Sequence, residues 1–514
     1  MGNGYLILDE CHNASGDSGI GHYFQHIVGK AKGVTFISAT FAKRPDNMPI
    51  YAMRTAMSKA GMEASDLIEA IRTGGTTLQE IMSQTLTESG QMIRRERDMT
   101  GVSIDYVPMD EAGSVEEQKT KYDSIIDIFN DIIDFQKRFV DSYLDTRNEE
   151  LADIQTEMAK DGRDFEAEGW DWRYYADRAK RAKYSFDENE LRPYLKLENV
   201  RDGLFYCANK LYGITLKPLS NVPLPHPDAQ AFEVFDRDGS RLAILFMDFF
   251  PRASKRGGAW CGTYRDQTYE NGKKVIPIVT VVCNFSKPAA GEPALLNADE
   301  TSTMFHEFGH ALHQFFQNVH YQGVSNVPRD FVELPSQVNE HWAFAPEVLK
   351  VYAKHYKTGE VMPQSLVEKL DRSSKYGQGF ASTEYLAASL LDMDFHVLEN
   401  IPDDFDVMEF ERKTLVDRGL LNQIPSRYRT TYFNHTMGGG YTAGYYSYIW
   451  AEVLEADAFN AYQETGDIFN QEVAAKFRKH ILTPGGINDA MDMYVNFRGK
   501  KPSIEPLLKN RGLK

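Results

Sequence analysis

The chain has 514 residues, of which 42% are hydrophobic and 25% charged, a composition that excludes disordered, collagen-like and disulfide-scaffold proteins. This length exceeds one ordinary domain, so we expect roughly two to four domains. The formal net charge of -17 disfavours a protein that works by coating phosphate groups, and we expect no nucleic-acid partner.

The ends and the cysteines of the chain predict its compartment. Four cysteines (Cys11, Cys207, Cys261 and Cys283) show no C-x-x-C spacing, which indicates neither a disulfide framework nor a thiolate metal site. The first residues lack the pattern of a signal peptide, and no window is apolar enough to span a membrane. We therefore expect a cytoplasmic protein without a membrane partner.

The first 160 residues change character along their length. Apolar runs at 5–8 and 33–38 predict two strands, with a helical stretch at 22–30 between them. From 57 to 158 the pattern is helical with charged faces, and the acidic stretch 145–164 is the candidate domain boundary.

The remainder predicts a largely helical domain with a small sheet. Residues 168–212 have a helical pattern, and 241–250 and 276–285 are rich in β-formers, with 257–262 as a loop between them. After 297 the chain is mostly helical to its end, broken by glycines at 438–440 and 484–486.

A candidate metal site begins with His306-Glu-Phe-Gly-His310 on a predicted helix. Histidines at i and i+4 lie on one face, one turn apart, and suit tetrahedral Zn²⁺, with one position left for a water molecule. Glu307 can then act as general base. The alternative, incidental histidines on a core helix, is weakened by Gly309, because a glycine inside a helix costs about 0.5 to 1 kcal/mol unless something must approach closely there.

A third ligand is still required, and Glu333 is the best candidate. Asp330, Gln337 and Glu340 are possible partners for the other ring nitrogens of the imidazoles, and the sequence does not choose among them. His313 extends the same helix face, but a partly exposed polar residue is the more favoured interpretation.

The segments HEFGHALHQFF and PRDFVELPSQVNEHW resemble the thimet-oligopeptidase and peptidyl-dipeptidase family of zincins. The resemblance continues in 241–262, in HTMGGGYTAGYYSY at 435–448 and in the C-terminal FRGKKPSIEPLLKNRGL, covers about 157–514, and is greatest to the bacterial peptidyl-dipeptidase branch. It implies that the family's N-terminal half is missing here.

The resemblance also implies roles for individual residues. Glu333 would be the third zinc ligand, and His435, Tyr441 and Tyr448 would bind substrate and stabilise the tetrahedral intermediate. The alternative for the tyrosines stays open, because Tyr441, Tyr445 and Tyr448 have the spacing of a buried helix stripe. A further hypothesis is that the strand at 242–250 pairs with extended substrate by edge addition.

Segments before about 158 resemble a different family, the strawberry-notch-like branch of helicase-type NTPases. They are LILDECHNASG, GVTFISATFAKRPDNMPIY, GGTTLQEIMSQ and IDIFNDIIDFQKRFVD. The resemblance implies an Mg²⁺ box at Asp9-Glu-Cys-His12 and a coupling motif at Ser38-Ala-Thr40. No G-x-x-x-x-G-K-[ST] phosphate loop occurs in the sequence, so we expect this part to be inactive.

These observations predict two domains. Residues 1–155 would be an α/β fragment of a helicase-like NTPase core followed by helices, and 156–514 a mainly α-helical zincin catalytic domain with a small β-sheet. The predicted function is a peptidase with one zinc per chain that acts on short peptides, most readily by releasing C-terminal dipeptides. The alternatives are an oligo-endopeptidase of the same family and, in another class, an NTPase fragment linked to nucleic acid or an inactive fusion product.

Overall fold

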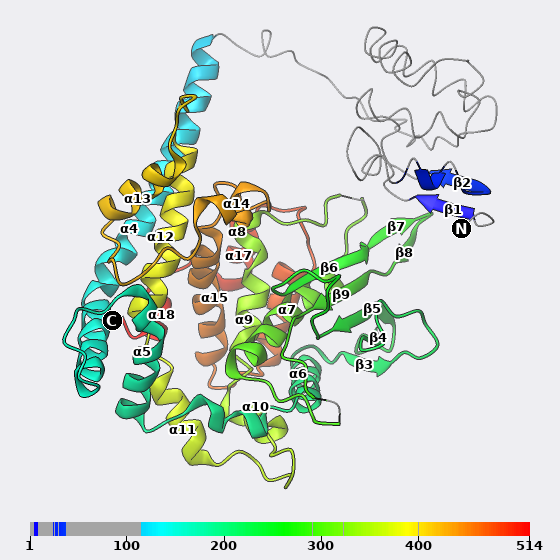
Figure 1. Cartoon of the computed structure of the whole chain (residues 1–514). Helices are drawn as coiled ribbons and strands as arrows, with labels where there is room; N and C mark the ends of the chain where they lie inside the picture. Colours follow the sequence, from blue (N-terminus) through cyan, green and yellow to red (C-terminus); the bar gives the residue numbers. More distant parts are fainter. Residues whose placement is uncertain are drawn as a thin grey trace. The chain divides into compact units, whose positions relative to one another are not determined.

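The structure, a computed structural model, describes residues 5–8, 24, 26–28, 30–36 and 115–513, except 290, 322 and 399 (Figure 1). The chain divides into two compact units, Met1–Ala112 and Gly113–Lys514. In the described part, no helix is both long and apolar enough to cross a membrane.

The first unit contains the two strands predicted near the N-terminus. β1 (Tyr5–Leu8) and β2 (Gly33–Phe36) pair in parallel, with Tyr5 opposite Gly33. The predicted Asp9–His12 and Ser38–Thr40 motifs, and the helical pattern from 57 to 114, lie outside the described residues. The resemblance of these N-terminal segments to helicase-type NTPases therefore stays a prediction. The fourth segment given for it, IDIFNDIIDFQKRFVD, lies instead in a helix of the second unit, Val115–Lys160.

The second unit is mostly helical, as predicted. Three α-helices precede its sheet: α4 (Val115–Lys160), α5 (Gly169–Tyr184) and α6 (Leu197–Tyr212). The α-helices described after the sheet are α7 (Ala298–Phe316), α8 (Arg329–Val332), α9 (Leu334–Glu340), α10 (Pro346–Tyr352), α11 (Gln364–Ser373), α12 (Gln378–His396), α13 (Val407–Asp417), α14 (Asn434–Met437), α15 (Ser447–Gln463), α16 (Gln471–Phe477), α17 (Ala490–Arg498) and α18 (Glu505–Arg511). Shorter turns are η4 (Glu188–Glu190), η5 (Arg192–Tyr194), η6 (Thr430–Tyr432) and the π-helical η7 (Arg478–Leu482). The predicted glycine breaks follow α14 and η7.

A five-stranded sheet with the order β3-β4-β5-β9-β6 lies beside these helices. Its strands are β3 (Thr215–Pro218), β4 (Gln230–Phe235), β5 (Arg241–Asp248), β6 (Trp260–Arg265) and β9 (Ile278–Val282), and a separate hairpin joins β7 (Thr268–Glu270) to β8 (Lys273–Val275). β5 and β9, the two predicted strands, are neighbours and run parallel.

Two expectations about the sheet are wrong. The predicted loop at 257–262 is already strand from Trp260 onward, because β6 pairs with β9 there. β5 is an interior strand with β4 on one side and β9 on the other, so its backbone groups are already paired and it offers no edge to a substrate.

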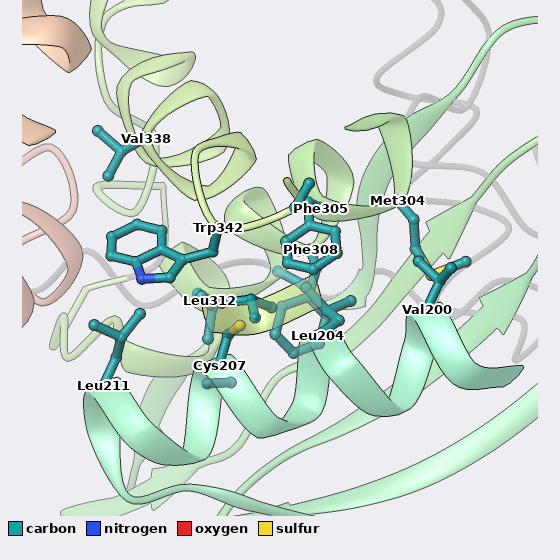
Figure 2. Close-up of a cluster of buried hydrophobic side chains, with 14 of the residues drawn as sticks. Val200, Leu204, Cys207, Leu211, Met304, Phe305, Phe308, Leu312, Val338 and Trp342 are labelled. Atoms are coloured by element: carbon teal, nitrogen blue, oxygen red, sulfur yellow. The ribbon is translucent and has the colours of Figure 1, made fainter. Parts of the chain in front are cut away.

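The largest core cluster fixes the orientation of α7. Figure 2 shows apolar side chains of α6, spaced one turn apart, packed against one face of α7 and against residues at the end of α9. The labelled residues are Val200, Leu204, Cys207, Leu211, Met304, Phe305, Phe308, Leu312, Val338 and Trp342. Because this face of α7 is buried, its opposite face is left for His306 and His310, which are only half-buried.

Helix α4 is an integral part of the second unit and runs alongside α12 (Figure 1). Its Glu150 carboxylate accepts hydrogen bonds from the backbone N–H groups of Gly379 and Phe380 at the start of α12, each at 2.9 Å. Its Tyr143 is buried against Leu386 of α12 and Ile449 of α15. The boundary predicted near 155 thus falls inside α4, whereas the compact units divide after Ala112.

Candidate metal centre

The helix that carries the histidine motif is capped at its first residue. The Asn297 side chain accepts a hydrogen bond from the backbone N–H of Glu300 at 2.7 Å, and the Glu300 carboxylate accepts one from the N–H of Asn297 at 3.0 Å. This capping box satisfies two otherwise unpaired donors and sets the start of α7. Downstream, the ring centroids of His306 and His310 lie 5.0 Å apart on one face.

Gly309 lets α9 pack directly against α7. A Cβ at this position would lie 2.5 Å from the carbonyl oxygen of Pro335 and 2.6 Å from Cα of Ser336. The close approach that the sequence predicted at Gly309 is therefore an approach of the α9 backbone. It brings the α8–α9 junction, and Glu333 within it, to the histidines.

Three side chains converge on one point. The Nε2 atoms of His306 and His310 lie 3.3 and 3.2 Å from the same oxygen, Oε2 of Glu333. One ligand atom from each residue lies within 4.8 Å of the other two. Two imidazoles and one carboxylate are a donor set that suits tetrahedral zinc with a fourth position open, so the residues present fit the metal that the motif predicts.

Glu340 orients the first histidine. Its Oε1 lies 2.6 Å from Nδ1 of His306, which places the ring proton on Nδ1 and leaves Nε2 free as a ligand. The other two candidates have different partners: Asp330 accepts a hydrogen bond from the Tyr446 hydroxyl at 3.1 Å, and Gln337 donates one to a backbone carbonyl oxygen of α15 at 3.2 Å.

Glu307, the predicted general base, has a buried carboxylate beside the histidines. Its side chain is buried, yet it lines the cavity beside the histidines, and Oε2 has no hydrogen-bond partner within the described residues. A buried acceptor without a donor is costly, so an unpaired oxygen here points to a missing water or substrate group. Burial also raises the pKa of the Glu307 carboxyl.

The tyrosines predicted for the site divide into two groups. The Tyr441 hydroxyl donates a hydrogen bond to Oε1 of Glu333 at 2.6 Å, and its ring stacks on Tyr448 at 5.1 Å. Tyr445 is buried in an apolar cluster behind them, with its ring centroid 5.4 Å from that of Tyr448. The helical stripe proposed as an alternative for these residues is wrong, because α15 begins only at Ser447 and Tyr441 lies in the preceding turn.

A buried carboxylate of α12 holds that turn. Asp392 is fully buried and accepts hydrogen bonds from the backbone N–H groups of Ala443 at 3.2 Å and Tyr445 at 2.9 Å. Ala443 adopts a φ of +49°, a left-handed conformation that is unfavourable for alanine. Asp392 therefore stabilises the backbone that presents Tyr441.

His435 lies on the same wall of the cavity. Its ring centroid is 5.9 Å from that of Tyr441. Burial and the nearby charge of Arg427 lower the pKa of His435, which keeps the imidazole neutral at pH 7. Burial likewise raises the pKa of Tyr441 and of Tyr448, so both phenols stay protonated and can donate hydrogen bonds.

His313 differs from its prediction in one respect. It is buried rather than partly exposed, with an exposed fraction of 2%, and burial lowers its pKa to about 4. It does not belong to the group of ligand atoms at His306, His310 and Glu333.

All seven predicted site residues line one cavity of about 850 Å³. Sequence reasoning missed part of its wall: Trp260, Cys261 and Tyr264 come from β6, which was predicted in part as loop. It also missed Arg329, four residues before Glu333 and hence one helical turn away, a spacing that could have indicated it.

Comparison of the sequence with known proteins identifies relatives that are all peptidases. A family model described as peptidase family M3 matches residues 117–513. Dipeptidyl carboxypeptidase of Escherichia coli K12 is 43% identical over 385 residues, which cover 74% of this chain and 56% of that protein. Oligopeptidase A of the same strain is 37% identical over 357 residues, covering 68% of this chain and 52% of that protein. The chain thus spans about half the length of these relatives.

The solved structure of a carboxypeptidase from Pyrococcus furiosus aligns with 73% of this chain and with 79% of the carboxypeptidase chain, at 14% identity and a TM-score of 0.36. This likeness is too weak to support a conclusion.

Proposed function

The chain belongs to peptidase family M3, and on this premise we propose that its second unit hydrolyses short peptides with one zinc ion held by His306, His310 and Glu333. The observation that carries the proposal is the convergence of these three ligand atoms beside Glu307, whose oxygen is buried without a partner among the described residues.

Zinc, when bound, polarises a carbonyl group and acidifies water. The chain supplies the proton transfers. Glu307 accepts a proton from the attacking water and delivers it to the leaving amine, a role that suits a carboxyl group whose pKa is raised by burial. Glu340 keeps His306 in the tautomer that leaves Nε2 available.

Donors for the developing oxyanion come from the turn before α15. Tyr441, Tyr448 and neutral His435 are protonated donors on one wall of the cavity. Preorganised donors of this kind act strongly where water is excluded. The hydroxyl of Tyr441 is at present bonded to Glu333, so it reaches substrate by exchanging that partner.

The peptide backbone has a place to bind at β6. This strand ends the sheet and pairs only with β9 among the described strands, and three of its residues line the cavity. A peptide that pairs with its free edge gains main-chain hydrogen bonds independent of sequence, which suits a peptidase of broad specificity. Edge addition thus moves from β5, where it was predicted, to β6.

Release of C-terminal dipeptides is the favoured mode, because the dipeptidyl carboxypeptidase is more similar to this chain than the oligopeptidase is. Cleavage inside oligopeptides is the alternative. For residues 1–112, the first unit, the proposal remains an inactive helicase-like fragment, which would be abandoned if adenine nucleotides raised the melting temperature of the full chain. Residues 117–155, predicted as part of that fragment, are matched by the peptidase family model and lie in α4 of the second unit. The cytoplasmic location also stays a prediction.

The test compares the full chain with Glu307→Gln and with a His306→Ala, His310→Ala double variant. Zinc content and cleavage of blocked tripeptides are measured on all three. We expect zinc with activity in the parent, zinc without activity in Glu307→Gln, and neither in the double variant. A parent chain that retains no zinc, or activity that survives in Glu307→Gln, would refute the proposal.

A further inference from the structure

Four cationic side chains line the cavity of the metal centre: Arg252, Lys255, Arg256 and Arg329. Two of them are neutralised internally. Arg252 and Lys255 both contact the buried carboxylate of Asp248, at 2.8 and 3.0 Å. Arg256 and Arg329 pair with no carboxylate among the residues that the structure describes, so they are the positive charges left for a ligand.

Arg329 is held beside the zinc-binding residues. Its guanidinium carbon lies 4.6 Å from the ring centroid of Tyr441, the tyrosine whose hydroxyl contacts Glu333. On the turn side, Nη2 lies 3.4 Å from the position that a Cβ would occupy on Gly440, so the guanidinium is in van der Waals range of this turn. The guanidinium is thus positioned by stacking, while the residue stays exposed at the cavity.

Arg329 and Glu333 both contact the side chain of Tyr441, so one tyrosine side chain separates them. Two residues in an extended conformation span roughly 7 Å from a scissile carbonyl to a terminal carboxylate. Arginine is also the side chain that binds a carboxylate through two parallel hydrogen bonds.

We propose that Arg329 binds the free C-terminal carboxylate of the peptide and so sets cleavage two residues from the end. This inference rests on the proposed function and names the group that the dipeptide-releasing mode requires. Arg256 is the less suitable candidate. It lies in the loop before β6, where its carbonyl oxygen accepts a hydrogen bond from the Asn284 side chain, and within the described part of the chain it has no hydrogen bond or ion pair with the three ligand residues.

The test uses a blocked tripeptide with a free C-terminus and the same peptide as its C-terminal amide, cleaved by the zinc-loaded full chain. The parent is expected to favour the acid over the amide roughly 10- to 150-fold in kcat/KM, the range of a charge-assisted hydrogen bond. Arg329→Gln should lose this preference, because cleavage of the acid should slow far more than cleavage of the amide. Arg329→Lys should restore part of it.

Arg256→Gln is the matched control and should keep the preference for the acid. If Arg329 only stacked on Tyr441, its loss would slow both peptides equally, and the inference would be wrong. Loss of the preference in Arg256→Gln alone would assign the carboxylate to that residue instead.

A binding measurement separates this inference from the proposed function. Calorimetry of a free dipeptide and its amide with the zinc-loaded chain needs no turnover. Tighter binding of the free dipeptide, lost in Arg329→Gln, supports the role of Arg329 even in a chain that cleaves nothing. Equal binding of the two to the parent overturns it.

Discussion

Replacing Gly309 by alanine should disturb the metal centre through the backbone of α9. The new Cβ would lie 2.5 Å from the Pro335 carbonyl oxygen and 2.6 Å from Cα of Ser336, so α9 must move away by several tenths of an ångström. Alanine gains about 0.5 to 1 kcal/mol of helix propensity, but overpacking of this kind costs about 1 to 3 kcal/mol. We expect a net loss of roughly 1 to 2 kcal/mol in unfolding free energy.

The movement also reaches the proposed zinc ligand Glu333, because the Ser336 hydroxyl donates a hydrogen bond to its Oε2 at 3.1 Å. Zinc affinity, measured by chelator competition, should fall about 10- to 100-fold, as when other supporting contacts of a ligand are lost. Gly203→Ala is the control, because its Cβ would meet the Tyr352 side chain at 2.5 Å, away from the metal centre. If both variants lose stability but bind zinc equally well, Gly309 does not position Glu333.

Three further changes test other contacts of the site. Glu340→Gln should lower zinc affinity about 10- to 100-fold by weakening the orientation of His306, and an unchanged affinity would contradict this. Tyr441→Phe should lower kcat about 10²- to 10³-fold with little change in KM, so a raised KM at constant kcat would argue against an oxyanion role. His313, whose pKa is lowered to about 4, stays neutral in the fold while the unfolded chain protonates below about pH 6.5. The contribution of neutral His313 to the free energy of unfolding is therefore complete above that pH. It is lost as the pH falls towards 4, by up to about 3 kcal/mol. Urea unfolding of the zinc-free chain at several pH values should show that the unfolding free energy of His313→Leu falls less steeply with acidification than that of the parent chain. Equal slopes of unfolding free energy against pH for the two chains would refute this.

The parts of the candidate metal centre that depend on local helix geometry could be predicted from the sequence. His306 and His310 lie together because a helix places i and i+4 on one face, and Gly309 signalled a close neighbour. The choice of Glu340 over Asp330 and Gln337 was not predictable, because it depends on how α9 is rotated against α7. That rotation is set by packing around Gly309, which no spacing along the chain expresses.

The sheet illustrates a second limit of sequence reasoning. β5 and β9 are apolar and were recognised as strands, whereas β6 follows two glycines and contains a third, which masks its strand character. Strand order depends on the path of the chain between strands, so β5 could not be identified as interior from its composition. The spacing of Tyr441, Tyr445 and Tyr448 misled in a similar way, because the turn at Ala443 delays the start of α15.

Helix α4 has a practical consequence for shortening this protein. A fragment that starts at residue 156 would lose Glu150 and leave two N–H groups at the head of α12 without their acceptor. The same helix α12 carries Asp392, which holds the turn of Tyr441. Removing the residues before 156 would therefore weaken the support of the turn that carries Tyr441, whereas removing the residues before Gly113 would leave these contacts intact.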